Sequence, residues 1–150
     1  MGSGESRATG SRRRKTAMAD RPFPLDFATL APDARPRRWL VLPEGFDASA
    51  QPDQISPHFK VKPEVLLVRF KALALEQPRV TLVRETEGQV ELVQRSRLFR
   101  FPDYITAEAM ETDGGSALAI YSRAVIGYSD IGVNRKRIMA WLDALSAQLG

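Results

Sequence analysis

Length, composition and charge bound the kinds of protein that this sequence can encode. The chain has 150 residues, of which 43% are hydrophobic and 27% are charged, and this suits one globular core rather than two. It has no cysteine and a single histidine, His58, so disulfides, thiol catalysis and metal centres held by cysteine or several histidines are excluded. A carboxylate site for magnesium or calcium has no EF-hand spacing to support it, and we expect neither a metal nor a cofactor.

The excess of basic charge lies in the N-terminal tail. Residues 1–17 hold five basic residues and one acidic residue, which accounts for the net charge of +4 of the whole chain. The remaining body is neutral, so nucleic acid is not its expected partner. Because residues 1–20 contain few apolar side chains that could be buried, they are predicted to form a disordered basic tail. This tail is either native or, if translation starts at Met18, not part of the native protein.

The sequence also carries information on location. No apolar run approaches the roughly 20 residues that span a bilayer, and the basic N-terminus lacks the apolar segment of a secretory signal. We therefore expect no transmembrane segment and a cytoplasmic location. The arginine- and serine-rich tail leaves a transit peptide as an alternative.

Residues 21–62 contain seven prolines, a spacing that forbids long helices and central strands. Short apolar pieces such as residues 39–42 lie between the prolines. We predict an extended, proline-rich arm that packs on a single domain spanning residues 21–150.

Hydrophobic periodicity predicts two helices after the arm. The first runs from Pro63 to about Glu76, and the second covers residues 133–149. Their buried stripes are expected at Leu66, Phe70 and Leu73 in the first helix, and at Ile138, Trp141, Leu142 and Leu145 in the second.

Between the helices the period changes from 3.6 to 2, which predicts strands. They are expected at residues 79–85, 90–101, 105–111 and 117–126, with turns at 87–88 and 113–115. On the long second strand Val93, Arg95, Arg97, Phe99 and Phe101 would share one face. The order of elements predicts an α+β fold, a two-layer sandwich of a four-stranded antiparallel sheet and two helices on one face.

Two stretches carry a family resemblance. Residues 94–103 read QRSRLFRFPD, and residues 121–137 read YSRAVIGYSDIGVNRKR. They resemble the uncharacterised bacterial and plastid family catalogued as domain of unknown function 1499, over about residues 35–149. The resemblance implies a fold and no established activity. Many members of that family carry a hydrophobic anchor or signal ahead of the domain, and we expect none in this chain, because its basic N-terminus is not followed by an apolar segment.

The turn at residues 127–132 lies where two catalytic motifs are often found, but it matches neither. A nucleophile elbow needs glycine at position 131, where this chain has isoleucine, and nothing places His58 near Ser129. A phosphate loop needs Lys-Ser/Thr where Val133 and Asn134 stand, and it belongs in a parallel sheet. No catalytic residue is assigned.

The final helix begins with three cations, Arg135, Lys136 and Arg137, where the macrodipole disfavours positive charge. One interpretation is a receptor for phosphate, sulfate or a carboxylate, made of free amides and of arginines that the strands bring near. We favour this non-enzymatic binding domain, with a small anionic or lipid-like ligand as partner. Its candidate residues are Arg97, Arg123, Ser129, Asp130, Asn134, Arg135 and Arg137.

Two other interpretations stay open. In the first, the domain is a structural or protein-interaction module whose turn is a helix cap and whose charges form an internal network of Asp103, Asp130, Arg97 and Arg123. In the second, the domain is an enzyme on an anionic substrate with Asp130 or Asp103 as base. No protein partner is identified.

Overall fold

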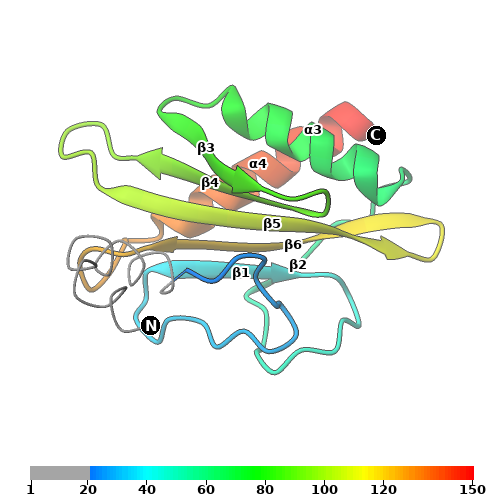
Figure 1. The fold of residues 1–150 in the computed structure, drawn as a ribbon, viewed down its shortest axis with the longest axis horizontal. Coiled ribbons are helices and arrows are strands. Elements are labelled where there is room, and N and C mark those ends of the chain that lie inside the picture. Colours follow the sequence, from blue (N-terminus) through cyan, green and yellow to red (C-terminus); the bar gives the residue numbers. More distant parts are fainter. Residues whose placement is uncertain (1–20) are drawn as a thin grey trace, which may run out of the picture.

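The computed structural model describes residues 21–150; the tail predicted at residues 1–20 lies outside the described residues. The described chain forms one six-stranded mixed sheet. Two helices cover one face of the sheet, and the first part of the described chain runs along the other face (Figure 1). The α+β class is therefore confirmed.

The sheet has the strand order β2-β1-β6-β5-β4-β3. β1 and β2 are parallel, and the other neighbours are antiparallel. The strands are β1 (Arg38–Leu42), β2 (Gln54–Ile55), β3 (Val80–Glu85), β4 (Gln89–Arg95), β5 (Pro102–Thr112) and β6 (Gly115–Ala124).

The prediction of four antiparallel strands is wrong in detail, because the proline-rich segment supplies two more. β1 pairs antiparallel with β6, with Val41 opposite Ile120, and β2 adds to β1 in parallel. The apolar run of β1 thus covers the edge of β6 that would otherwise remain unpaired. The predicted arm is therefore partly a component of the sheet.

The strand predicted over residues 90–101 is too long. β4 ends at Arg95, and a closed turn follows in which Ser96 N donates to Phe101 O (2.9 Å) and Phe101 N donates to Ser96 Oγ (2.8 Å). Arg100 takes a left-handed φ of 62° in this turn. Arg97 and Phe99 consequently lie in a loop, and the next strand begins at Pro102, earlier than predicted.

Both helices form where the periodicity predicts them, as α3 (Pro63–Leu75) and α4 (Val133–Leu149). The seven stripe residues named above are buried, whereas Val65, which the periodicity also adds to the stripe of the first helix, is 43% exposed. The stripes meet where the rings of Phe70 and Trp141 pack edge to face with centroids 6.0 Å apart. This contact joins the two helices above the sheet.

Side chains of the sheet alternate between two cores. The helix-side core includes Leu118 and Ile120, whereas Ala119 and Tyr121 belong to a smaller core under the arm. The arm is fixed there by Gln89, whose amide accepts from Leu25 N (2.6 Å) and donates to Leu25 O (2.9 Å). This alternation decides on which side of the sheet each candidate residue lies.

Gly115→Ala is expected to lower the free energy of unfolding by roughly 1–3 kcal/mol, in the range of overpacked cores. A Cβ at position 115 would lie 2.0 Å from the backbone oxygen of Phe59. That oxygen accepts from Ser116 N at 2.8 Å, so it cannot move without loss of pairing. Urea titration measures the effect. Gly88→Ala, with no atom within 4 Å of the new Cβ, is the matched control, and equal losses in both variants would contradict the prediction.

Candidate functional site

Arg137 connects α4 to the sheet. Its Nη2 contacts Asp103 Oδ2 at 2.8 Å, and its Nε donates to Gln94 Oε1 at 2.5 Å. Its Nη1 donates to Asn134 Oδ1 (2.6 Å) and Ser122 Oγ (3.2 Å). The side chains of the ion pair are only 8% and 15% exposed. Such a satisfied, buried polar network fixes the helix on the sheet.

Asp130 caps the N-terminus of α4. Its Oδ1 accepts a hydrogen bond from Gly132 N (2.9 Å), and its Oδ2 accepts from the backbone N (2.9 Å) and Nδ2 (2.8 Å) of Asn134. Ser129 Oγ accepts from Ile131 N at 3.1 Å. These amides are therefore occupied by the protein itself, and the carboxylate offsets the cations of the first turn.

Arg135 lies against an aromatic ring. Its guanidinium carbon is 5.5 Å from the centroid of the Trp39 ring, a cation–π contact that helps to stabilise a charge at the positive end of a helix. A shallow hollow of about 430 Å³ beside it is also lined by Arg35 and Arg38. Arg38 donates to Asp53 Oδ2 at 2.7 Å, so its charge is already paired.

The structure brings Ser129, Asp130 and Arg135 together around the shallow hollow, but it places the other three predicted arginines apart. Arg97 is exposed in the β4–β5 loop, Arg123 is buried on the arm side of β6, and Arg137 is on the helix side. These arginines therefore do not converge on one pocket. The predicted network also has a different composition, since Arg137 rather than Arg97 or Arg123 pairs with Asp103 in the described chain.

The residues considered for catalysis lie apart as well. His58 Nε2 is 3.0 Å from Asp113 O, at the turn before β6, whereas Ser129 follows the other end of that strand. The length of β6 therefore separates them. Asp130 accepts from backbone amides, and Asp103 is held by Arg137. Asp130 lines the shallow hollow beside Arg135, but both of its oxygens already accept hydrogen bonds from Gly132 and Asn134.

A pocket of about 740 Å³ lies between the arm and the end of β6, a size typical of small-molecule sites. We call it the arm-side pocket. Its basic lining residues are Arg21, Arg37 and Arg123, and its apolar lining includes Pro22, Pro24, Leu25, Leu30, Ala31 and Val125.

One of the cations in this pocket has a carboxylate partner on the arm. Arg37 Nε lies 2.5 Å from Asp33 Oδ2, and Asp33 N donates to Tyr121 OH at 2.9 Å. Burial raises the pKa of Asp33, but hydrogen bonds and positive charge from Arg35 and Arg37 outweigh it, so the pKa lies below its ordinary value. Asp33 is therefore ionised and neutralises Arg37.

Arg123 forms the floor of the arm-side pocket, and its side chain is 8% exposed. All of its hydrogen bonds come from Nη1, which donates to Thr106 Oγ1 (2.8 Å), Tyr121 O (3.0 Å) and Tyr104 O (3.5 Å). Its Nε and Nη2 donate no hydrogen bond to any residue from 21 to 150. Burial lowers the pKa of Arg123 to about 10, partly opposed by the charge of Glu91, so the group stays charged at neutral pH.

These two nitrogens are not sealed inside the protein. Among residues 21–150, Thr112 Oγ1 is the one fully buried side-chain polar atom that lacks a hydrogen bond. Nε and Nη2 of Arg123 are therefore not fully buried, and Arg123 is one of the residues that line the arm-side pocket.

Glu91 is a buried carboxylate next to Arg123 that sequence reasoning missed. It is 1% exposed and accepts from Arg21 Nε at 3.0 Å and from Arg84 Nε at 2.6 Å, whereas Arg123 Nη2 is 3.8 Å away. Glu91 is thus committed mainly to the other two arginines. A charged residue between Val90 and Leu92 on a strand of buried residues was the available signal for this site.

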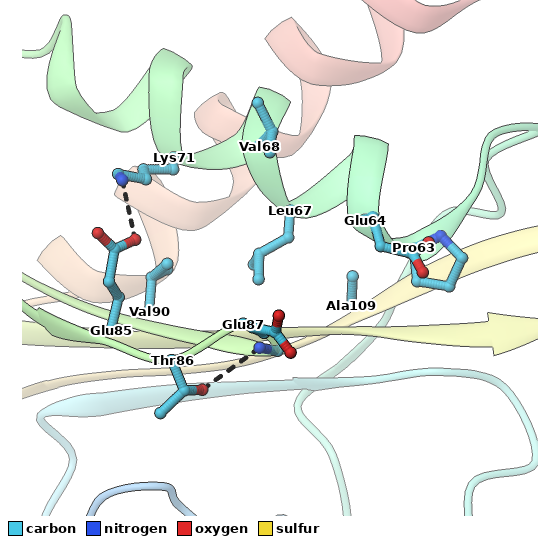
Figure 2. Close-up of a pocket in the computed structure, with 11 residues that line it drawn as sticks. Pro63, Glu64, Leu67, Val68, Lys71, Glu85, Thr86, Glu87, Val90 and Ala109 are labelled. Carbon is cyan, nitrogen blue, oxygen red and sulfur yellow. Dashed lines mark hydrogen bonds and ion pairs between the residues drawn. The ribbon is translucent and has the colours of Figure 1, made fainter.

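A groove of about 640 Å³ lies between α3 and the β3–β4 hairpin. Figure 2 shows Leu67 and Val90 in it, with Lys71 of α3 reaching toward Glu85; Lys71 Nζ and Glu85 Oε1 are 2.8 Å apart. Glu64 and Glu87 also line this groove. None of the predicted ligand-binding or network residues lines this groove.

The part of the chain that the structure describes has neither a cluster of metal ligands nor a membrane-spanning helix. No group of three or more histidine, cysteine, aspartate or glutamate side chains in residues 21–150 could hold a metal ion. Within the same residues, no helix has the length and apolarity required to cross a membrane.

The fold and its pockets thus define an α+β domain with helices on one face of a mixed sheet and an arm-covered pocket on the other. The chain belongs to the family described as "Protein of unknown function (DUF1499)", whose model matches residues 24–145. This match confirms the family that the two sequence stretches indicate. No curated protein matches the chain significantly.

Proposed function

We propose that the domain binds a small amphipathic anion in the arm-side pocket. The observation that supports this function is the buried Arg123, which lines the pocket and whose Nε and Nη2 have no hydrogen-bond acceptor in the described chain. Because these two nitrogens are not fully buried they are not stranded donors, but a guanidinium fork with no protein acceptor can form strong, charge-assisted hydrogen bonds with an anion. A bound anion would supply the acceptors.

The shape of the donor group and the lining of the pocket favour a carboxylate with an apolar part. Nε and Nη2 of an arginine form a planar fork that matches the two oxygens of a carboxylate or a phosphate. Pro22, Leu25 and Leu30 of the arm would cover the apolar part. The ligand would therefore bridge the arm and β6.

A structural module without a ligand is the second candidate, and the N-terminus of α4 favours it. There Asp130 occupies the helix amides, and Asp103 pairs with Arg137. This arrangement involves three of the candidate residues named from the sequence, Asp103, Asp130 and Arg137, but it lies on the helix side of the sheet and does not satisfy Arg123.

The proposal is tested by titrating the protein with octanoate and following its melting temperature and heat of binding. Octanoate is expected to raise the melting temperature saturably, because a ligand that binds only the native state stabilises it. Octanol, which lacks the charge, is expected to have a smaller effect. Arg123→Lys should weaken octanoate binding by about tenfold or more, because lysine lacks the planar fork.

Ala31→Trp separates the pocket from the arginine itself. Ala31 is exposed and lines the pocket, so a tryptophan there should obstruct it and leave Arg123 in place. Ala147→Trp, at an exposed position of α4, is the matched control. The proposal is wrong if neither octanoate nor inorganic phosphate gives a saturable response, or if Ala31→Trp binds octanoate as wild type does.

A further inference from the structure

Exposed apolar side chains gather at one end of the sheet. Among residues 21–150 the four most exposed large hydrophobic residues are Leu98 (78%), Phe99 (69%), Tyr128 (71%) and Ile131 (85%). The first two lie on the β4–β5 loop and the other two on the β6–α4 loop. The register of β4, β5 and β6 brings both loops to the same end of the sheet (Figure 1). We call these four residues the apolar end.

Both loops are held by defined contacts. Ser96 and Phe101 close the β4–β5 loop with two hydrogen bonds, and the rings of Phe99 and Phe101 stack with centroids 5.5 Å apart. The β6–α4 loop is held by Arg37 Nη1, which donates to Gly127 O at 2.9 Å. The protein therefore presents these apolar side chains from ordered loops.

The conformation of Ile131 is not explained by the stability of the fold. Its φ is 55°, a left-handed value that is unfavourable for a β-branched residue and favourable for glycine or asparagine. Its side chain is 85% exposed, so burial does not compensate for the strain. An outlier of this kind is a reason to look for a partner.

The charge around the apolar end is positive. Residues 95–101 contain three arginines and no acidic residue, and both Arg97 and Arg100 are exposed. Lys136 of α4 is also exposed. Two acidic residues adjoin the apolar end: Asp103 is paired with Arg137, and Asp130 accepts hydrogen bonds from Gly132 and Asn134. A partner surface that complements the apolar end would therefore be apolar at its centre and negatively charged around it.

We propose that the apolar end docks on an anionic lipid bilayer, a role that goes beyond ligand binding in the arm-side pocket. Aliphatic and aromatic side chains enter the headgroup region while flanking arginines contact the lipid phosphates. The projecting form of the loops favours a bilayer over a protein, because a stable protein interface buries about 800 Å² on each partner and needs a broader surface. Large exposed apolar patches mark such interaction sites.

The first test is co-sedimentation of the full chain with vesicles of phosphatidylcholine alone or mixed with about one-third phosphatidylserine, an anionic lipid. We expect binding to the mixed vesicles, reduced about tenfold or more in Leu98→Ser/Ile131→Ser and in Arg97→Glu/Arg100→Glu. Matched controls are Val68→Ser and Arg69→Glu on α3, both at exposed positions. Every variant retains residues 1–20, so the attraction of their basic charge is constant. Equal binding by all variants would overturn the proposal.

The second test reports on insertion. Because the chain has no cysteine, Leu98→Cys and Val68→Cys each allow one environment-sensitive fluorophore to be attached. Anionic vesicles should shift the emission to shorter wavelength at position 98 and leave position 68 unchanged. No shift at position 98 would overturn docking. Self-association of the wild type that Leu98→Ser/Ile131→Ser abolishes, without vesicle binding, would assign the apolar end to a second copy of the chain instead.

Discussion

Trp141→Ala is expected to lower the free energy of unfolding by roughly 3–5 kcal/mol, as for other buried tryptophans. The side chain of Trp141 is 5% exposed, and its ring packs edge to face on Phe70 of α3. Its removal would leave a cavity between the two helices and the sheet. Equilibrium denaturation in urea measures the change.

Met139→Ala is the matched control for this substitution, because Met139 is on the same helix and is 39% exposed. It is expected to change the stability by less than about 1 kcal/mol. A similarly small loss for Trp141→Ala would mean that α4 is not docked on the core, in conflict with the helix-side packing described above.

Arg137→Met is expected to lower the free energy of unfolding by roughly 3–5 kcal/mol, because removing one partner strands the other buried charge. Asp103 would lose its guanidinium, Gln94 Oε1 would lose its donor, and Asn134 Oδ1 would keep only the hydrogen bond from Ser122 Oγ. If Arg137 were instead only an unfavourable positive charge near the positive end of the α4 dipole, Arg137→Met would raise the free energy of unfolding.

Two further variants separate these effects. Lys136→Met removes the neighbouring exposed cation and should leave stability nearly unchanged. Adding Asp103→Asn to Arg137→Met should recover part of the loss, because the asparagine carries no charge to strand. If Arg137→Met alone stabilises the protein, the Arg137 network does not hold α4 on the sheet.

The helices were predictable from local pattern, and the complete sheet was not. α4 covers the predicted residues 133–149, since the stripe from Ile138 to Leu145 has helical spacing and glycine precedes the helix. β1 was missed because a four-residue apolar run among prolines has no local sign of its partner. Its pairing with β6 is set by contacts that are distant in the sequence. The end of β4 was missed because Ser96 and Phe101 close a turn without glycine.

The candidate site was predictable residue by residue but not as an arrangement. The cations of the first turn of α4 and Asp103 were singled out, and the structure joins Arg137 to Asp103. The period of two also places Ser122 and Arg123 on opposite faces of β6. Packing decides which face of the sheet α4 covers and which face the arm covers. Because α4 covers the face of Ser122, Arg123 lies in the arm-side pocket. Periodicity alone does not contain that information.

The pairing of β1 with β6 has a consequence for the order in which the chain folds during synthesis. Val41 cannot pair with Ile120 until residue 120 has been synthesised. The ribosome therefore makes most of the domain before β1 can join the sheet. Closing so long a loop is entropically expensive and slows folding. β3, β4, β5 and β6 can meanwhile pair in succession as they emerge, each with the strand just made. The N-terminal segment therefore docks among the last parts, and the edge of β6 is the surface at risk of wrong pairing until it does.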